Sequence, residues 1–335
     1  MQANKLFLAA TVAVFSGLLG CTPPPPRATV VGNRVLIQGE VGQEVRSLNA
    51  ETGKPVAKFP FEGWADGLDS SGRLVFMHGA NGLAARDIDT GAVKWRIFMK
   101  LGYGWRAVAG GGVVFAPQWQ EDKPTWVGFD AATGSRRFEF KSDRWAPLAA
   151  NSDIAVTLEK RSLVGYSLAD GKERWRSEIE ARPPVFIEGN RLFARVDDQI
   201  GVFTASSGAL RRKLEPEGSS QFIAFRGSRP QMAANSEHLA WVASDTLMVA
   251  NLESGKIKWT RPESELLAMT DDVVVTNDGT KVVGLDPATG KVKWRVEADN
   301  DPEGLSAADG LVTIRAGGLQ VVDAATGKSR FKLSL

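Results

Sequence analysis

Two ten-residue stretches decide the fold of this chain: Leu285-Asp-Pro-Ala-Thr-Gly-Lys-Val-Lys-Trp294 and Arg86-Asp-Ile-Asp-Thr-Gly-Ala-Val-Lys-Trp95. In both, Asp-x-x-Thr-Gly is followed four residues later by tryptophan. Asp and Thr side chains bond nearby backbone amides and Gly adopts positive φ, so the segment predicts a tight turn between two strands. The turn glycine recurs eight times at a mean spacing of about 39 residues: Gly53, Gly91, Gly134, Gly171, Gly208, Gly255, Gly290 and Gly327.

Each repeat contains four short β-rich runs and no helical periodicity. In the fifth repeat, for example, the runs 184–188, 191–196 and 199–204 precede the turn, and a fourth run follows it. Four strands per repeat predict an all-β fold, an eight-bladed β-propeller of four-stranded antiparallel blades. Such a ring buries its apolar surface in many small interfaces between neighbouring blades.

A large aromatic residue stands four positions after most of the turn glycines. The period-2 alternation of a strand predicts that this side chain faces the adjoining blade, where it fills the interface. Two repeats depart from the pattern, with Ala57 and Arg212 at the same position. The aromatic members are Trp95, Phe138, Trp175, Trp259, Trp294 and Phe331.

The pattern Asp-x-x-Thr-Gly-Lys-x-x-x-Trp resembles the PQQ-like (pyrroloquinoline quinone) propeller repeat, and the resemblance covers residues 29–335. Quinoprotein dehydrogenases share this repeat. The resemblance implies that such enzymes place adjacent cysteines against the quinone and bind calcium through a Glu, an Asn and an Asp. This chain has one cysteine, Cys21, and no set of residues that maps onto those ligands. We therefore expect no cofactor, no metal and no enzymatic activity.

Composition excludes several classes of protein. The chain has 335 residues with 41 Lys plus Arg and 39 Asp plus Glu, a net charge of +2, which argues against a nucleic-acid binder. The single cysteine excludes an intramolecular disulfide framework. The two histidines, His78 and His238, cannot by themselves form a three-histidine metal site.

The N-terminus reads as an export signal. Lys5 precedes an uncharged run over residues 6–19, which as a helix would span only about 21 Å, short of the ~30 Å hydrocarbon core. The run ends in Leu18-Leu19-Gly20-Cys21, which resembles a bacterial lipoprotein signal with a lipidated cysteine. We predict a signal peptide over 1–20, a lipidated cysteine with a Pro-rich spacer over 21–28, and the propeller over 29–335.

The resemblance extends to localisation and partners. Thr22 after the cysteine favours the outer membrane, with the domain facing the periplasm. A lipid-anchored single propeller of eight such blades resembles the BamB family of outer-membrane assembly lipoproteins. That likeness implies a protein-binding scaffold whose partners are envelope proteins, with the outer-membrane β-barrel assembly machinery as the candidate partner. We expect a monomer outside its complex, membrane contact through the lipid alone, and no nucleic acid.

Repeat length points to a candidate binding face. The long spacings reflect insertions at 119–124 and 215–230, in connections that emerge opposite the Thr-Gly turns. Aromatic and arginine residues, which are enriched in binding hot spots, gather in these and other inter-blade connections. The alternative is that several fold back over their own blades. The candidate partner-binding residues are Trp64, Tyr103, Trp105, Trp119, Trp145, Phe222, Phe225, Arg226 and Arg229.

Two further functions stay open from sequence. One is a periplasmic propeller that binds or senses a ligand or glycan through the aromatic face. The other is a quinone-dependent dehydrogenase, against which the lack of paired cysteines argues. The first would be recognised by a specific ligand and the second by turnover.

Lipidation gives the first prediction. Cys21→Ser removes the sulfur that would carry the diacylglycerol, so the variant should be released from membranes or remain an uncleaved precursor. Metabolic labelling with a fatty acid measures the effect. Equal label in the variant and the native protein would contradict the predicted anchor.

Overall fold

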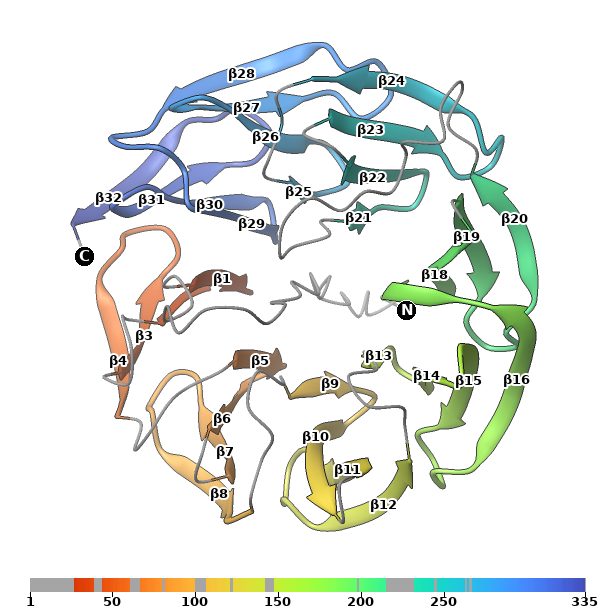
Figure 1. Cartoon of the computed structure of the whole chain (residues 1–335). Helices are drawn as coiled ribbons and strands as arrows, with labels where there is room; N and C mark the ends of the chain where they lie inside the picture. Colours follow the sequence, from red (N-terminus) through yellow and green to blue (C-terminus); the bar gives the residue numbers. More distant parts are fainter. Residues whose placement is uncertain are drawn as a thin grey trace, which may run out of the picture.

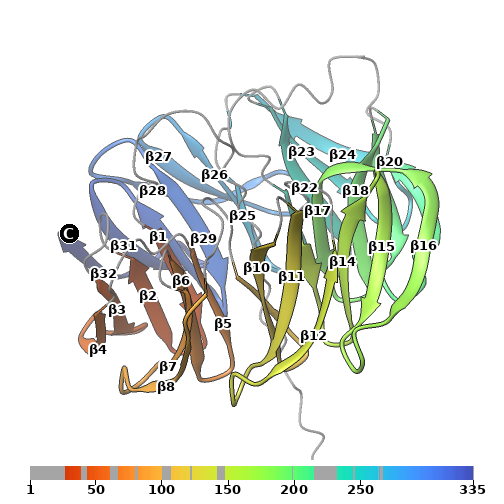
Figure 2. The same ribbon diagram turned by 60° about the horizontal axis from the view of Figure 1, so that its bottom comes forward.

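In the computed structural model, eight four-stranded antiparallel sheets stand around a central axis (Figure 1). A tilted view shows them packed side by side as the blades of a propeller (Figure 2). The predicted all-β, eight-bladed fold is confirmed. The structure describes residues 27–38, 44–60, 67–79, 82–99, 107–120, 123–141, 148–197, 199–214, 232–243, 246–262, 264 and 267–334.

The first four blades occupy the N-terminal half of the described chain. Blades 1 and 2 contain β1 (Arg27–Val31), β2 (Arg34–Gln38), β3 (Glu44–Asn49), β4 (Pro55–Pro60), β5 (Gly67–Ser71), β6 (Leu74–Gly79), β7 (Gly82–Asp87) and β8 (Val93–Ile97). Blades 3 and 4 contain β9 (Val108–Gly110), β10 (Val113–Gln120), β11 (Lys123–Asp130), β12 (Arg136–Lys141), β13 (Leu148–Ala150), β14 (Ile154–Glu159), β15 (Ser162–Ser167) and β16 (Glu173–Glu180).

The remaining blades complete the ring. Blades 5 and 6 contain β17 (Arg182–Glu188), β18 (Arg191–Val196), β19 (Gln199–Thr204), β20 (Leu210–Leu214), β21 (Met232–Ala234), β22 (His238–Ala243), β23 (Thr246–Asn251) and β24 (Ile257–Arg261). Blades 7 and 8 contain β25 (Ala268–Met269), β26 (Val274–Asp278), β27 (Lys281–Leu285), β28 (Val292–Glu297), β29 (Gly304–Ala308), β30 (Leu311–Arg315), β31 (Gly318–Asp323) and β32 (Ser329–Ser334). No helix in these described segments has the length and apolar character needed to cross a bilayer.

Every sheet is built from four consecutive strands, with the first nearest the axis and the fourth at the rim (Figure 1). No strand is therefore shared between the first and last blades within the described chain. The ring closes through side chains instead: Val30 and Ile37 of blade 1 share one buried cluster with Leu319 and Val321 of blade 8. A hydrogen bond from the Gly32 backbone amide to the Asp309 side-chain carboxylate, 2.7 Å long, reinforces this junction.

Buried apolar side chains lie between blades. Each of the eight described hydrophobic clusters joins two neighbouring sheets. Between blades 7 and 8, for example, Val275 and Val282 pack with Val312 and Val322, all fully buried. Since apolar burial is worth roughly 25 cal/mol per Å², stability is distributed over these interfaces and no single central core is needed.

The predicted turn chemistry is present in detail. Asp286 Oδ1 accepts bonds from the Thr289 amide, 2.8 Å, and the Thr289 hydroxyl, 2.7 Å. The Gly290 amide donates to the Asp286 carbonyl, and Gly290 adopts a φ of 71°. The hydrogen bonds from Thr289 hold the pKa of the Asp286 carboxyl below its ordinary value. Asn251 Oδ1 plays the same part for the Ser254 amide, so the turn needs the acceptor oxygen rather than the charge.

In six blades the aromatic residue of the outer strand faces the adjoining blade, as predicted, and lies over the turn glycine of that blade. Trp294 is buried, and its indole N–H donates to the Ala324 carbonyl of blade 8 at 2.8 Å. A Cβ at Gly327 would lie 2.8 Å from the Trp294 ring, too close for any side chain. The same contact joins the pairs Trp95–Gly134, Phe138–Gly171, Trp175–Gly208, Trp259–Gly290 and Phe331–Gly53.

The two departures from the aromatic pattern have different solutions. In blade 1 the small Ala57 leaves the position open, and Phe59, fully buried, approaches Gly91 instead. In blade 5 Arg212 itself lies over Gly255, with its Cδ and Nη1 atoms 3.3 Å from where a Cβ would stand. All eight junctions therefore have a large side chain near the turn glycine.

Removing one of these contacts should destabilise the ring. Trp294→Ala would leave a cavity between blades 7 and 8 and a carbonyl without its donor, at a cost of about 3–5 kcal/mol. Phe98→Ala, which truncates an aromatic side chain that is 76% exposed, is the matched control and should change stability little. Chemical denaturation of both variants measures the difference, and an unchanged midpoint for Trp294→Ala would contradict the proposed packing.

Candidate protein-binding surface

The alternating strand directions give the ring two faces. The turns between first and second strands and the Thr-Gly turns emerge together, and we call this side the turn face. The connections between second and third strands, and those from blade to blade, emerge on the opposite side, which we call the loop face. The fourth strands form a third surface, the outer wall (Figure 1).

The sequence predicts binding residues on the loop face, and their side chains all lie outside the described part of the structure. Trp119 is described by its backbone alone: it lies near the end of β10, paired with Pro124 of β11. The insertion at 119–124 thus forms part of a hairpin of two eight-residue strands. The other predicted residues lie outside the described part of the chain: Cys21, Trp64, Tyr103, Trp105, Trp145, Phe222, Phe225, Arg226 and Arg229.

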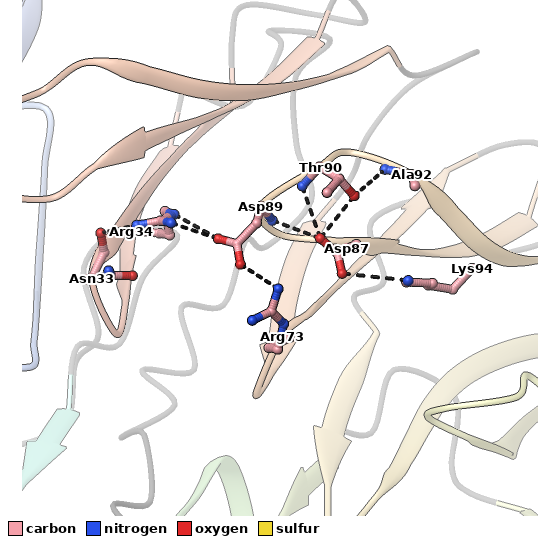
Figure 3. Close-up of polar contacts among 8 residues, drawn as sticks. All are labelled: Asn33, Arg34, Arg73, Asp87, Asp89, Thr90, Ala92 and Lys94. Atoms are coloured by element: carbon pink, nitrogen blue, oxygen red, sulfur yellow. Dashed lines mark hydrogen bonds and ion pairs between the residues drawn. The ribbon is translucent and has the colours of Figure 1, made fainter.

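Polar groups of the turn face bond to one another across blade junctions. Between blades 1 and 2, the Arg34 guanidinium contacts the Asp89 carboxylate at 2.8 Å, and Arg73 contacts its other oxygen at 2.7 Å (Figure 3). Beside them Asp87 accepts the Thr90 amide and hydroxyl, and its pKa is lowered, chiefly by the Thr90 amide. This network ties the turns together, so its charges are engaged within the ring.

Two more junctions on this face use asparagine. The Asn151 amide donates to the Gly189 carbonyl, 2.8 Å away, which links blades 4 and 5. The Asn235 amide donates to the Asp271 carbonyl, 3.2 Å away, which links blades 6 and 7. Each asparagine side chain thus bonds to the backbone of the next blade, so its role is to hold neighbouring blades together.

Among the described residues, burial shifts the pKa values of Glu188 and His238. Burial, and secondly the Asp271 carboxylate, raise the pKa of Glu188 to about 7. Burial lowers the pKa of His238, which favours its neutral form. His78 is buried on β6, four blades away from His238 on β22. No three His, Cys, Asp or Glu side chains cluster as a metal site among the residues that the structure describes.

The outer wall of blades 1 and 2 carries the exposed large apolar side chains of the described chain. These are Val56, 37% exposed, Val93, 46%, and Phe98, 76%. The outward position of Phe98 is fixed by its neighbours, since Ile97 and Met99 both pack on the cluster between blades 2 and 3. The ring of Phe98 is therefore exposed one residue beyond the end of β8.

A cation accompanies this aromatic. The guanidinium carbon of Arg96 lies 5.8 Å from the centroid of the Phe98 ring, a cation–π arrangement. Arg96 lies on β8, and Phe98 follows Ile97, the last residue of that strand. The contact between the guanidinium and the ring places the two side chains together. The pair combines the residue types that interfaces favour.

Phe98 was absent from the sequence-based prediction, which concentrated on long connections. The signal that could have found it is the repeat itself: Phe98 is the seventh residue after its turn glycine. The same position in the other blades holds proline, charged residues or serine: Pro60, Lys141, Glu178, Glu215, Pro262, Glu297 and Ser334.

Solved structures share this fold at low identity. The crystal structure of BamB from Moraxella catarrhalis is 13% identical, with a TM-score of 0.63 and 96% of each chain covered. The dihydro-heme d1 dehydrogenase NirN has a TM-score of 0.67 at 13% identity, with 95% of this chain and 76% of that chain covered. The quinohemoprotein alcohol dehydrogenase from Comamonas testosteroni has a TM-score of 0.57 at 13% identity, covering 96% and 74% respectively.

These likenesses establish the architecture, which enzymes and an assembly protein have in common. No curated protein sequence matches the chain. A sequence model described as outer membrane protein assembly factor BamB matches residues 83–264 and 207–334, from β7 to β32. The chain therefore belongs to the BamB family of PQQ-like repeat β-propellers.

Proposed function

We propose that this protein is a non-enzymatic scaffold that binds protein partners during the assembly of outer-membrane β-barrel proteins. It would be held at the periplasmic side of the outer membrane by lipid on Cys21. The observation that carries the proposal is the match of an assembly-factor family across residues 83–334. A role in protein binding without chemistry also accords with the single cysteine, since quinoprotein-type catalysis would call for an adjacent pair.

The construction of the ring supports a scaffold role. Eight interfaces, each with a buried cluster and a side chain against the turn glycine, hold the blades in a fixed relation. Binding residues positioned on rigid strands lose little conformational entropy when a partner docks. Loops and strand ends at the rim can then vary without disturbing the interfaces.

The loop face is the proposed docking site for the assembly partner. The sequence predicts that the long connections and most aromatic residues outside the repeat pattern belong to it, including Trp119, Phe222 and Phe225. The turn face is a weaker candidate because its polar side chains bond across the blade junctions, as Arg34 does with Asp89. We therefore expect substitutions on the loop face to weaken partner binding and substitutions on the turn face to have little effect on it.

An alanine series over both faces tests this assignment. Truncating Trp119, Phe222 or Phe225 should weaken partner binding by about 2 kcal/mol or more, a ~30-fold loss, if the residue is a hot spot. Lys256→Ala and Lys328→Ala, at exposed turn-face positions, are the controls and should have little effect. Capture of the intact envelope complex and thermal melting are read together.

The outcomes of the series separate the possible functions. Recovery of a β-barrel assembly protein, lost in the loop-face variants at unchanged melting temperature, supports the scaffold. Losses confined to the turn face, or losses that track destabilisation in every variant, would overturn the assignment of the face. Capture of a specific glycan or an unrelated receptor would favour the ligand-sensing alternative.

The non-enzymatic part of the proposal has its own test. Because the chain has no cysteine pair, purified protein mixed with pyrroloquinoline quinone and calcium should show no stoichiometric binding and no oxidation of alcohols or sugars. Titration calorimetry and a dye-linked assay provide the measurements. A site of micromolar affinity or tighter with turnover would replace the scaffold by a dehydrogenase.

A further inference from the structure

Positive charge is concentrated on the outer wall. The eight fourth strands together contain 17 Lys or Arg and 5 Asp or Glu, a difference of +12. The whole chain has a net charge of +2, so everything else carries −10. The outer wall is therefore strongly cationic although the net charge of the whole chain is close to zero.

The charge follows the repeat. The positions three and five residues after each turn glycine flank the inward aromatic position, and all sixteen are exposed. The two positions of each strand are two residues apart, so their side chains lie on the same side of the strand, about 6.8 Å from each other. Thirteen of the sixteen are cationic: Lys58, Lys94, Arg96, Arg137, Arg174, Arg176, Arg211, Lys213, Lys258, Lys293, Arg295, Arg330 and Lys332.

Structural roles explain part of this pattern. Lys94 lies 3.6 Å from Asp87 and Arg330 lies 2.9 Å from Asp323, so some cations pair with the acids of their own turns. Charged residues on an exposed edge also discourage pairing between copies of a protein. Neither role calls for exposed apolar side chains on the same strand.

Two described outer strands have exposed apolar side chains: β4 has Val56, and β8 has Val93, with Phe98 one residue beyond its end. Lys94, Arg96 and Phe98 point outward in succession, and Val93 at the start of the strand is 46% exposed. β8 is the last strand of its sheet, so no other described strand pairs with its outer edge. A row of backbone donors and acceptors is thus flanked by two cations and an aromatic ring.

We propose that β8 is a second docking site, which accepts an extended acidic segment of a partner protein as a fifth strand of blade 2. Backbone bonds would hold the segment, carboxylates at alternate positions would face Lys94 and Arg96, and an apolar side chain would cover Phe98. The choice of an acidic partner rests on charge complementarity with the rim, and that of an apolar residue on the exposure of Phe98. The site adjoins the loop face, because Phe98 begins the connection from blade 2 to blade 3. It goes beyond the proposed function because it names an edge strand and the chemistry of the segment that the strand would bind.

A peptide probe tests the site. We would titrate the full chain with a fluorescent peptide in which Asp, Glu and Leu alternate with Thr, and compare a version with N-methylated backbone amides. Arg96→Glu and Phe98→Ala should each weaken binding about tenfold or more, and Arg96→Lys should retain it. Arg295→Glu, the equivalent outward position of blade 7, is the matched control and should bind normally.

Each result decides for or against the site. Tight binding that falls with salt, requires backbone amides and depends on Arg96 and Phe98 at an unchanged melting temperature supports it. Equal loss in Arg295→Glu would indicate diffuse attraction to the rim, and equal binding of the N-methylated peptide would exclude strand addition. Binding only to vesicles of phosphatidylglycerol would assign the rim to a lipid surface instead. Capture of the assembly partner by Phe98→Ala is measured in parallel, so failure at β8 is distinguishable from failure of the proposed function.

Discussion

The contact between an outer-strand side chain and the turn glycine of the next blade is the constraint on which this ring depends. A Cβ at Gly134 would lie 2.7 Å from the Trp95 ring, and one at Gly327 would lie 2.8 Å from Trp294. Glycine is therefore needed twice, for its positive φ and for its missing side chain. The indole N–H then bonds a carbonyl of the same neighbouring turn, which joins hydrogen bonding to packing at one point.

This contact divides the outer strand into two independent sides. The aromatic side chain and its alternate neighbours, such as Ile97 and Met99, are committed to the interface between blades. The intervening side chains, such as Arg96 and Phe98, are exposed. Because the strand period is two, a change on the outward side leaves the inward contact intact. The ring can thus keep one architecture while the chemistry of its wall changes.

The sequence predicts the repeat well because its determinants are local. In four turns the Asp, Thr and Gly satisfy one another within five residues, and strand alternation sets the direction of the aromatic side chain. Non-local features were harder. Nothing in the repeat indicates that Phe59 replaces Ala57 at Gly91, or that Phe331 reaches Gly53 to close the ring, because both depend on packing between separate blades. Phe98 was missed because the candidate residues were chosen from the long connections, and the positions of residues relative to the turn glycine of each repeat were not compared.

The separation of interface from wall also explains why the fold says little about activity. Proteins that are 13% identical to this chain, among them BamB and two dehydrogenases, share its architecture. What the ring requires is the turn, the glycine and the large side chain opposite it. Catalysis of the quinoprotein kind requires residues beyond that set, and protein binding requires exposed side chains with defined positions. In this chain Phe98, which is 76% exposed, and Arg96, whose guanidinium carbon lies 5.8 Å from the centroid of its ring, are described residues with exposed side chains, so the chemistry of this part of the wall is set separately from the contacts that build the ring.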